Sequence, residues 1–344
     1  MNAVGFREYG NENVLELMDV EDPVPGSGEV VMRVRYTSMN MLDVLVRKGY
    51  SRTGATLPHV PGADVVGTVE RLGGNVHGFG IGDTAIAHTL FGCGHCKSCA
   101  SMDESVCSEW KVVGRDIWGS YGELVKLPAS LLATPPEHYE MKELACMPLS
   151  LSVTWRAIST LASAEEGNSV VIRGASGNAG IFATLLSKAM GLQVLAITRS
   201  GEKAVSLKRI GADVVISASA ADEQKVEVLD ATDGKGADFV LESLGSTIEQ
   251  SVEMLKDGGK VILYGTAAGS NATIDVKKIY LHSRSVIGTH ASGKKEFESA
   301  LSFMSSKNIR PVIGRLIDIK EASKAHAMLQ NSEVFGKIVL EHRW

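Results

Sequence analysis

Hydrophobic positions follow two different patterns along the chain. Up to about residue 130 they form short runs separated by Gly, Pro and Asp, as in "GEVVMRVRYTSMN", "GADVVGTVERLGGNV" and "GFGIGDTAIAH". Short β-rich runs divided by turn residues are typical of a compact, mostly antiparallel β domain. We therefore expect a barrel-like domain in the first part of the chain.

From about residue 140 the pattern changes to apolar strands that alternate with amphipathic segments. The apolar runs are "SVVIRG", "QVLAITR", "ADVVIS", "ADFVLES", "GKVILYG" and "RSVIGTH". Their starts lie roughly 20 to 25 residues apart, which is the spacing of repeated βαβ units. Near-continuous apolar strands predict a parallel sheet covered by helices on both faces. The predicted fold class is α/β.

The last part of the chain contains a helical pattern, "KKEFESALSFMSSK", and then a strand, a helix and a strand. We expect this segment to return to the first domain. The predicted domains are residues 1–135 with 292–344, and residues 136–291. Two domains also suit the length, because 344 residues exceed what one core usually supports and 44% hydrophobic residues can fill two cores.

The charge distribution and the lack of a membrane-span or signal-peptide pattern limit the kinds of partner that we expect. The net charge is −5, and lysines and arginines are spread along the chain, so no basic stripe points to nucleic acid or to a membrane surface. No apolar run has the length of a membrane span, and the charged N-terminus lacks the core of a signal peptide. We expect a cytoplasmic protein whose partners are small molecules.

The stretch "VVIRGASGNAG" places three glycines between a predicted strand and a predicted helix. Such a turn lets the backbone approach a pyrophosphate and points helix N-terminal amides at it. A purely structural turn is the alternative. Because this turn opens a series of βα units, we favour dinucleotide binding. The predicted contacts are Gly174, Ser176, Gly177, Asn178, Ala179 and Gly180.

The end of the next strand bears on which dinucleotide is bound. An NAD site usually has Asp or Glu there, whereas this strand ends in Thr198, Arg199 and Ser200, with Lys203 one turn further on. A guanidinium and a hydroxyl suit a 2′-phosphate, so NADP(H) is the predicted cofactor. The alternative is that Arg199 is an ordinary solvated residue.

Further cofactor contacts are expected at the carboxyl ends of the later strands, where ligands of parallel sheets bind. These are Ser243, Gly245, Tyr264, Gly265 and Thr289, together with Lys337 from the returning tail. Each of them is equally compatible with a plain loop position.

Four of the five cysteines lie in the stretch "GCGHCKSCASMDESVC". Cys93, Cys96, Cys99 and Cys107 follow the pattern C-x2-C-x2-C-x7-C, and four thiolates can close tetrahedrally on Zn²⁺. A closed shell leaves no position for substrate, which predicts a structural zinc. An iron–sulfur cluster and unliganded cysteines are the alternatives, and the spacing favours zinc. We interpret His95 as a solvated loop residue.

These features resemble the medium-chain dehydrogenase/reductase family. The match includes the four-cysteine lobe, "GADVVGTVERLGGNVHGFGIGD", the glycine turn and the C-terminal "GKIVL". The resemblance implies a GroES-like β-barrel catalytic domain, a Rossmann domain and a structural zinc. It also implies, for the zinc alcohol dehydrogenases of the family, a second, catalytic zinc held by a Cys, a His-Glu pair and a further Cys or Asp.

The chain departs from that second ligand set. Asn40 stands where the first Cys is expected, Leu42 replaces the proton-relay hydroxyl, and Asp43 is retained. Ala63 and Asp64 stand where the family has the His-Glu pair. Neither an asparagine amide nor an alanine is a useful zinc ligand.

The third ligand position falls nearest Ser150, and Cys146 lies about one helical turn too early. We expect no catalytic metal. The alternative is a substitute site built from Asp43 and Asp64 with Cys146 or His59. Cys146 is otherwise interpreted as a small core residue.

The resemblance then favours the zinc-independent quinone oxidoreductase and enoyl reductase branch, on the pattern N-x-x-D…RxG…LP-x-VPGxD. It implies NADPH-dependent reduction of a quinone, an α,β-unsaturated carbonyl or an enoyl thioester. Asn40 is the candidate contact to a carbonyl or to nicotinamide, Tyr50 the candidate proton donor or polar orienter, and Asp43 a further candidate catalytic residue. Tyr50 as a rim residue and Asp43 as a helix cap are the alternatives.

Two rival functions stay open at this point. One is a zinc-dependent alcohol dehydrogenase with unusual ligands, and the other is a non-catalytic NADPH-binding sensor. The family resemblance implies a homodimer or homotetramer, with "RSVIGTHA" as the candidate edge strand for assembly.

Overall fold

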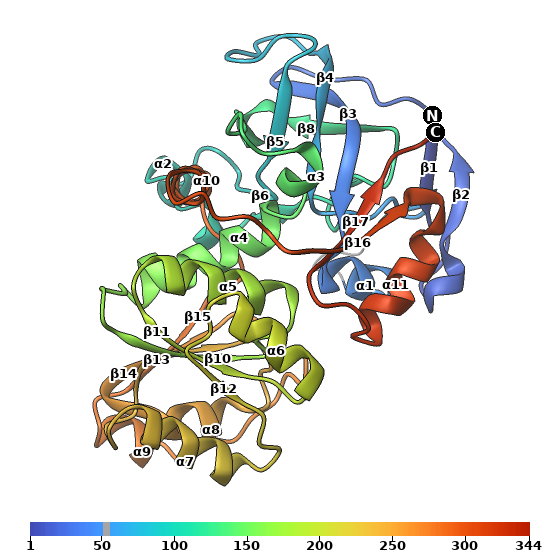
Figure 1. The fold of residues 1–344 in the computed structure, drawn as a ribbon. Coiled ribbons are helices and arrows are strands. Elements are labelled where there is room, and N and C mark those ends of the chain that lie inside the picture. The colour runs from blue at the N-terminus through green and yellow to red at the C-terminus, as the bar shows by residue number, and fades with distance from the viewer. Residues whose placement is uncertain (51–55) are drawn as a thin grey trace. The chain divides into compact units, whose positions relative to one another are not determined.

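The computed structural model describes residues 1–50 and 56–344, so the last four residues of the sequence stretch "RKGYSRTG" lie outside the described residues. The chain forms two compact units (Figure 1): Met1–Ser152 with Gly293–Trp344, and Val153–Ser292. The sequence placed this division after residue 135. The backbone contacts place it after Ser152, so residues 136–152 belong with the first unit.

The first unit is built on a seven-stranded sheet in the order β16-β17-β3-β4-β5-β9, with β8 also paired to β3. The pairing is antiparallel except between β16 and β17. The strands of this unit are β1 (Asn2–Gly5), β2 (Glu16–Asp19), β3 (Glu29–Ser38), β4 (Val65–Leu72), β5 (Thr84–Ala87), β6 (Leu90–Phe91), β7 (Lys111–Val112), β8 (Leu124–Pro128), β9 (Leu132–Ala133), β16 (Ile313–Asp318) and β17 (Lys337–Glu341).

Short helices connect these strands. They are α1 (Met41–Arg47), α2 (Lys97–Ala100), α3 (Met141–Leu144), α10 (Lys294–Ser306) and α11 (Ala322–Gln330), and α4 (Pro148–Trp155) begins in this unit. One apolar core lies among β3, β4, β5 and β8, where Val30, Val65 and Val125 are buried. A second core joins the N-terminal segment to α11 through Phe6, Tyr121 and Ala325.

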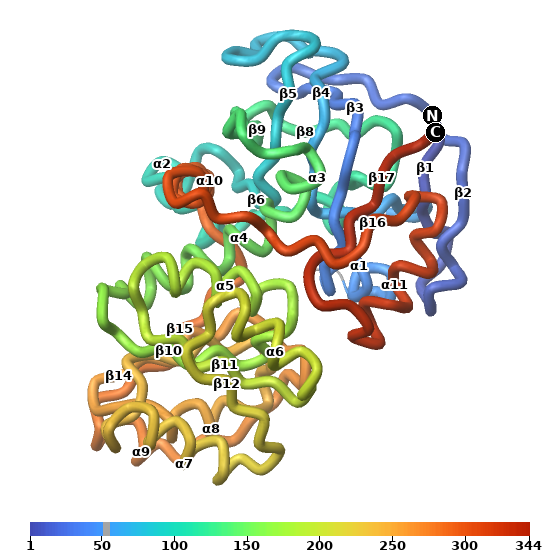
Figure 2. The backbone as a smooth tube through the Cα atoms, viewed as in Figure 1, coloured from blue at the N-terminus to red at the C-terminus, as the bar shows by residue number. Residues whose placement is uncertain are grey.

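The C-terminal strand returns to the first unit, as the sequence predicts. β17 pairs antiparallel with β3, and the two strands are labelled side by side in Figure 2. In this pairing Val339 lies opposite Ser38. The N–H of Met39 also donates to the carbonyl of Ile338 at 2.9 Å. This register brings the first residue of β17, Lys337, beside Asn40 at the end of β3.

The second unit is a six-stranded parallel sheet in the order β12-β11-β10-β13-β14-β15. It contains β10 (Ser169–Arg173), β11 (Gln193–Ile197), β12 (Val214–Ile216), β13 (Ala237–Glu242), β14 (Leu255–Leu263) and β15 (Ser285–Gly288), with α5 (Asn178–Ala189), α6 (Gly201–Arg209), α7 (Ala221–Ala231), α8 (Ile248–Glu253) and α9 (Lys277–Tyr280). Counted from β10, this is the strand order 3-2-1-4-5-6 of a Rossmann fold. The predicted α/β class, with a mostly antiparallel β unit and a doubly wound parallel sheet, is confirmed.

The six apolar runs of the sequence correspond to the six strands of this sheet. Helices α5 and α6 cover one face, and α7, α8 and α9 cover the other (Figure 1). Val171, Val240 and Val261 are fully buried in the centre because both faces of the sheet are covered. Within residues 1–50 and 56–344, no helix has the length and apolar character that crossing a bilayer requires.

Candidate functional site

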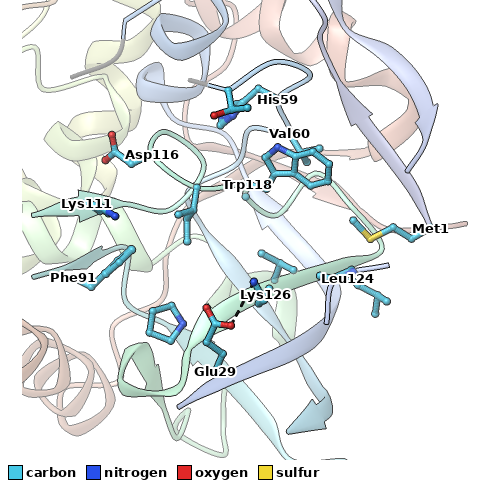
Figure 3. A pocket seen from close by; sticks show the side chains of 16 residues that line it. Met1, Glu29, His59, Val60, Phe91, Lys111, Asp116, Trp118, Leu124 and Lys126 are labelled. Atoms are coloured by element: carbon cyan, nitrogen blue, oxygen red, sulfur yellow. Dashed lines mark ion pairs between the residues drawn. The ribbon is translucent and has the colours of Figure 1, made fainter. Parts of the chain in front are cut away.

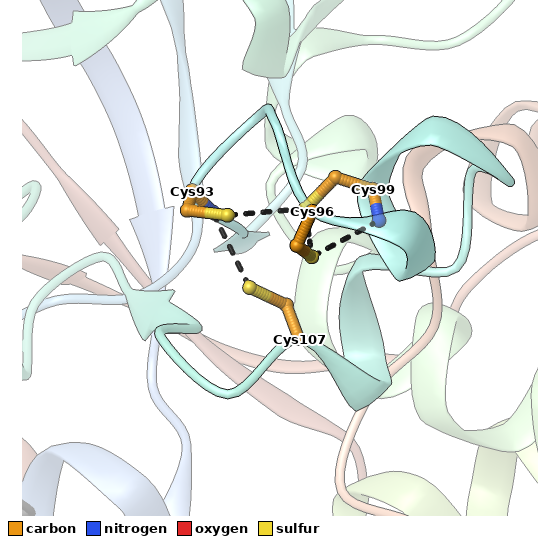
Figure 4. Close-up of side chains that lie close together, drawn as sticks. All are labelled: Cys93, Cys96, Cys99 and Cys107. Atoms are coloured by element: carbon orange, nitrogen blue, oxygen red, sulfur yellow. Dashed lines mark hydrogen bonds between the residues drawn. The ribbon is translucent and has the colours of Figure 1, made fainter.

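The four-cysteine loop gathers its sulfur atoms at one point (Figure 4). The Sγ atoms of Cys93, Cys96, Cys99 and Cys107 all lie within 4.8 Å of one another. Cys99 Sγ is 4.0 Å from that of Cys93 and 3.6 Å from that of Cys96. A tetrahedron of zinc–sulfur bonds has sulfur–sulfur edges of about 3.8 Å. The arrangement therefore fits one zinc ion with a closed thiolate shell.

Backbone groups support the thiolates. Cys93 N–H and Glu109 N–H each donate to Cys107 Sγ at 3.4 Å. Cys99 N–H donates to Cys96 Sγ and is the largest of several contacts that lower the pKa of that thiol to about 7, whereas burial raises the pKa of the Cys99 thiol to about 12. Gly92 is needed because a Cβ there would lie 2.4 Å from Cys99 Sγ. Such donors favour deprotonated sulfur, which is the form that binds metal.

Within the part of the chain that the structure describes, no other group of His, Cys, Asp or Glu side chains is arranged to hold a metal. The one overlapping alternative adds His95 and Glu109 to Cys93. His95 is exposed and its Nδ1 lies 3.0 Å from the carbonyl of Cys93, as suits a loop residue. The substitute site considered from the sequence is not formed: His59 Nε2 bonds the Gly114 carbonyl, and Cys146 donates to the carbonyl of Lys142.

Burial explains the state of those two groups. Burial lowers the pKa of His59 and raises that of the Cys146 thiol. His59 is only 2% exposed and packs against the ring of Phe6. Both side chains are therefore neutral core residues, as the sequence suggested for Cys146.

The glycine turn has the close packing that a nucleotide loop requires. Gly174 has a φ of +69°, and a Cβ there would lie 2.6 Å from Ser243 Oγ. A Cβ on Gly180 would lie 2.4 Å from the carbonyl oxygen of Gly174 and 2.6 Å from Ala175 Cα. Gly177 precedes the first residue of α5. Only glycine fits at 174 and 180, because neighbouring backbone and side chain occupy the space.

The turn also lies where the sheet changes direction. The strand order reverses between β10 and β13, and cofactors of open α/β sheets bind at such a switch point. Ser176, Asn178 and Ala179 surround the start of α5, whose first amides have no intrahelical acceptor. Binding of a pyrophosphate here stays a prediction.

Glu242, at the end of β13, holds the neighbouring loop in place. Its carboxylate accepts hydrogen bonds from the N–H groups of Leu244 at 2.6 Å and Gly245 at 3.2 Å, and from the Ser251 hydroxyl at 2.5 Å. Arg173 Nε lies 3.5 Å from the same carboxylate, and both side chains are buried. These interactions of Glu242, which the sequence did not suggest, order the loop that contains the predicted contacts Ser243 and Gly245.

The end of β11 carries the residues expected at the ribose. Thr198 is buried and donates to Ser176 Oγ at 3.4 Å, which joins this strand end to the glycine turn. Ser200 caps α6 by accepting the N–H of Lys203 at 3.3 Å. Arg199 is exposed. Burial lowers the pKa of Lys203.

The remaining predicted contacts of this unit also lie at strand ends. Gly265 packs so closely that a Cβ would lie 2.7 Å from the Ser243 carbonyl. Thr289 donates from its hydroxyl to the Ala291 carbonyl at 3.2 Å. Tyr264 precedes Gly265, and its amide donates to the Glu242 carbonyl. Their contacts with a cofactor stay predictions.

Lys337 does not lie in this unit. It belongs to the first unit, where only 2% of it is exposed. Its Nζ donates to Asn40 Oδ1 at 2.7 Å, to Asp64 Oδ2 at 3.2 Å and to Ser150 Oγ at 3.3 Å. The residues Asn40, Asp64, Ser150 and Lys337 are called the buried polar cluster below. The sequence treated Lys337 as a cofactor contact and missed this association.

Asp64 is the most heavily bonded member of the cluster. Its Oδ2 accepts from Ser38 Oγ at 2.5 Å and from Asn40 Nδ2 at 2.8 Å, in addition to Lys337. Its Oδ1 accepts the N–H of Leu149 at 2.9 Å. Its side chain is fully buried. The carboxylate is thus satisfied within the protein.

Asp43 lies next to the cluster at the start of α1. Its carboxylate accepts the N–H of Asn40 at 2.8 Å and the N–H of Ala63 at 3.1 Å. Burial raises the pKa of Asp43 to about 7, and the negative charge of Asp64 adds to the rise. These bonds favour the capping interpretation of Asp43, and a direct chemical role stays a prediction.

Tyr50 is outside the cluster. It is 54% exposed, and its amide donates to the carbonyl of Leu45. This suits a rim position, and its role as a proton donor stays a prediction.

A hollow of about 450 Å³ opens elsewhere in the first unit (Figure 3). Its wall includes His59, Trp118 and Phe91, with the ion pair of Lys126 and Glu29 at 3.4 Å. None of the buried polar cluster lines it. We therefore do not assign the chemistry to this hollow.

Comparison with known proteins identifies the class. The family model for the alcohol dehydrogenase GroES-like domain matches residues 26–137, and that for zinc-binding dehydrogenase matches residues 179–306. The chain belongs to the zinc-type alcohol dehydrogenase superfamily of medium-chain dehydrogenases/reductases, and it is an oxidoreductase of this nicotinamide-dependent family.

Individual relatives span the whole chain. A crystal structure of an NAD-dependent alcohol dehydrogenase is 31% identical with a TM-score of 0.94, and the match covers 100% of both chains. An acryloyl-coenzyme A reductase of Sulfurisphaera tokodaii is 27% identical over 96% of this chain and 98% of that protein. An NAD-dependent alcohol dehydrogenase of Sulfolobus acidocaldarius is 29% identical over 99% of each.

Proposed function

We propose that this protein reduces a conjugated carbonyl compound, an enoyl thioester foremost, with NADPH and without a catalytic metal. Quinones belong to the same class of acceptor. One observation carries the proposal. The family resemblance assigns the catalytic zinc ligands to positions that hold Asn40 and the pair Ala63 and Asp64, with Ser150 nearest the third, and Asn40, Asp64 and Ser150 surround a lysine ammonium.

This donor set is a poor metal site. Zinc in proteins binds thiolate, imidazole or carboxylate, and here only Asp64 is of these types. That carboxylate already accepts four hydrogen bonds, from Ser38, Asn40, Lys337 and Leu149. Ala63, at the expected histidine position, offers no donor atom in its side chain. A metal ion would have to break most of this network to gain one ligand.

The missing Lewis acid restricts the substrate. A metal stabilises the alkoxide of a simple alcohol or ketone reaction by several kcal/mol. A conjugated acceptor spreads the developing charge over its own π system and needs less help. The name of one full-length relative, acryloyl-coenzyme A reductase, supports an enoyl thioester within this class.

The chain's own residues would bind and orient the reactants. The glycine turn and the start of α5 are suited to the pyrophosphate, and Ser243 and Gly245 to the nicotinamide half. When bound, NADPH supplies the hydride that adds to the β-carbon. The buried polar cluster orients the carbonyl, and a proton completes the reaction at the α-carbon, or at oxygen in a quinone.

Preference for NADPH rests on the end of β11. No Asp or Glu lies there to bind the ribose 2′-hydroxyl, and Arg199 with the Ser200 hydroxyl suits a 2′-phosphate. Arg199 is exposed, so its guanidinium is accessible to a phosphate group.

Assembly of the chain is proposed to use β15. This strand is one edge of the six-stranded sheet, and Val286 on it is 37% exposed. A homodimer or homotetramer would pair such edges.

A turnover panel tests the proposed function. The purified protein is mixed with NADPH or NADH and with crotonyl-CoA, acryloyl-CoA, a 2-alkenal, 1,4-benzoquinone or cyclohexanone, and cofactor oxidation is followed. We expect turnover of the conjugated acceptors with NADPH and none of cyclohexanone. Turnover of cyclohexanone as fast as of the enoyl thioesters, or tight NADPH binding without any turnover, would contradict it.

A second candidate is favoured by the full-length similarity to NAD-dependent alcohol dehydrogenases. It predicts NAD⁺-dependent oxidation of simple alcohols and about two zinc ions per chain. The same panel, run in the oxidative direction with primary and secondary alcohols, separates the two.

A further inference from the structure

A lysine ammonium lies at the centre of the buried polar cluster. It has three N–H donors and three oxygen partners: Asn40 Oδ1, Asp64 Oδ2 and Ser150 Oγ. These partners come from three separate segments, namely the N-terminal boundary of α1, the loop before β4 and helix α4. The strand pairing of β17 with β3 brings Lys337 to them.

The three oxygen partners are distributed like a ligand set. Asn40, Asp64 and Ser150 stand at or beside the three positions that the family resemblance assigned to catalytic zinc ligands. The residues do not suit a metal, yet the structure brings them together around one positive charge. This positive charge belongs to a lysine side chain and not to a metal ion.

All four members of the buried polar cluster are almost completely buried. Asp64 is 0% exposed, whereas Asn40 is 4%, Ser150 is 3% and Lys337 is 2% exposed. Asn40 and Ser150 are the two uncharged partners, and the bond to Ser150 is the longer, at 3.3 Å against 2.7 Å, so Ser150 is the partner that another oxygen can replace at least cost. Its hydroxyl also lies 3.4 Å from Asn40 Oδ1, to which it can donate after such a replacement.

We propose that Lys337 supplies the positive charge that a catalytic metal supplies in zinc-dependent relatives, and that it donates an N–H to the carbonyl oxygen of the substrate in place of Ser150. This inference rests on the proposed function as a carbonyl-directed reductase. Asn40 and Asp64 act as positioning residues that hold the ammonium.

The electron balance is simple. As the β-carbon receives the hydride from NADPH, the electron pair of the C=C bond is delocalised over the α-carbon and the carbonyl oxygen. The substrate is then an enolate, with negative charge on that oxygen. The ammonium stabilises that oxygen through a hydrogen bond and forms no covalent bond. Water supplies the proton that the α-carbon takes up, so the products are the saturated thioester, NADP⁺ and a hydroxide ion that the buffer neutralises.

A purely structural ion pair of Lys337 and Asp64 is the competing explanation. It predicts that loss of the ammonium affects folding alone. A cofactor contact by Lys337 is another, and it predicts weaker NADPH binding with kcat preserved. The two explanations and the proposal therefore differ in which quantity changes.

The experiment compares wild type with K337M, which removes the charge, and K337R, which keeps it. K260M is the matched control, because Lys260 donates to the carbonyls of Leu161 and Ala162 in the second unit. The first readout is the carbonyl stretch of ¹³C=O-labelled crotonyl-CoA bound with NADP⁺, which cannot reduce it. The second is kcat, with NADPH affinity and the thermal midpoint measured separately.

We expect a lowered carbonyl stretch in wild type, K337R and K260M, and its loss in folded K337M. kcat of K337M should fall by roughly 100-fold or more, as on removal of an oxyanion donor. NADPH affinity should change by less than about threefold. Chemical rescue of K337A by ethylammonium would add support.

The proposal is overturned if folded K337M keeps the lowered stretch and its kcat, or if only NADPH affinity falls. These results presuppose that wild type reduces crotonyl-CoA. If wild type neither binds nor reduces any conjugated acceptor, the proposed function itself has failed, and the proposal for Lys337 fails with it. A K337M that does not fold is replaced by S150A, for which we expect a retained or strengthened carbonyl shift, and a lost shift would overturn the proposal.

Discussion

The buried carboxyl of Asp43 should make the stability of the first unit depend on pH. The pKa of Asp43 is raised from its ordinary value of 3.8 to about 7, chiefly by burial. A carboxyl group with a raised pKa in the folded state stabilises the fold fully below pH 3.8, where it is protonated in both states. That contribution is lost as the pH rises through about 7.

The size of the effect follows from the shift. One pKa unit corresponds to about 1.4 kcal/mol, so the rise is worth at most about 4 kcal/mol between acid and neutral pH. Asp43→Asn removes the charge while keeping an amide oxygen for the N–H of Asn40 or Ala63. Relative to wild type, D43N should therefore gain stability progressively from about pH 4 to about pH 7 and level off above it.

The assay is chemical unfolding followed by tryptophan emission at several pH values. Trp155 lies in the second unit, whereas Trp110, Trp118 and Trp344 lie in the first, so a W155F background reports the first unit. The matched control is D83N. Asp83 accepts the N–H of Gly80, three positions earlier in the chain, at 2.7 Å, as Asp43 accepts that of Asn40, also three positions earlier. Asp83 is exposed, whereas Asp43 is buried.

D83N should run parallel to wild type across the pH range, and D43N should diverge from it. If the curves of D43N and wild type stay parallel, the carboxyl of Asp43 does not change its ionisation on folding, and the electrostatic account of this region is wrong.

Three further predictions concern the metal and the cofactor. C107S should reduce the zinc content from about one ion per chain to near zero and lower the thermal midpoint, measured by metal analysis and calorimetry; full zinc retention would contradict the closed thiolate site. R199A should raise the KM for NADPH by roughly 10- to 100-fold with little change for NADH, and an equal change for both cofactors would exclude a 2′-phosphate contact. G180A should weaken NADPH binding and lower the thermal midpoint, because the added Cβ would lie 2.4 Å from the Gly174 carbonyl oxygen. G201A should leave the midpoint unchanged, because a Cβ at Gly201 would meet no atom within 4 Å. Equal midpoints of the two variants would contradict this expectation.

The second unit could be predicted well from the sequence. Its strands are buried on both faces, so each appears as a continuous apolar run between turn residues, and the glycine turn marks the first of them. Local signals were enough to find the strands and helices because each βα unit is one continuous segment of the chain. The cluster of four cysteine sulfurs was equally local, since the four residues lie in one short stretch of the sequence.

The buried polar cluster could not be predicted in this way. It depends on the register between β3 and β17, whose residues lie 297 positions apart at Asn40 and Lys337. "GKIVL" at the C-terminus signals a strand, but nothing local says that its lysine faces an asparagine and an aspartate.

Asp43 and Tyr50 show the same limit at shorter range. The sequence offered a chemical or a capping role for Asp43, and only the structure shows two backbone N–H groups bonded to its carboxylate. Tyr50 was chosen by its place in a loop, and its exposure of 54% depends on packing that residue types do not reveal.

The most direct test of the account is a metal count on the same preparation whose turnover is measured. Zinc per chain and kcat for crotonyl-CoA with NADPH are determined before and after mild treatment with a chelator that spares the four-cysteine site. The account predicts about one zinc ion per chain throughout and an unchanged kcat. About two zinc ions per chain, with kcat lost as the second is removed, would contradict it.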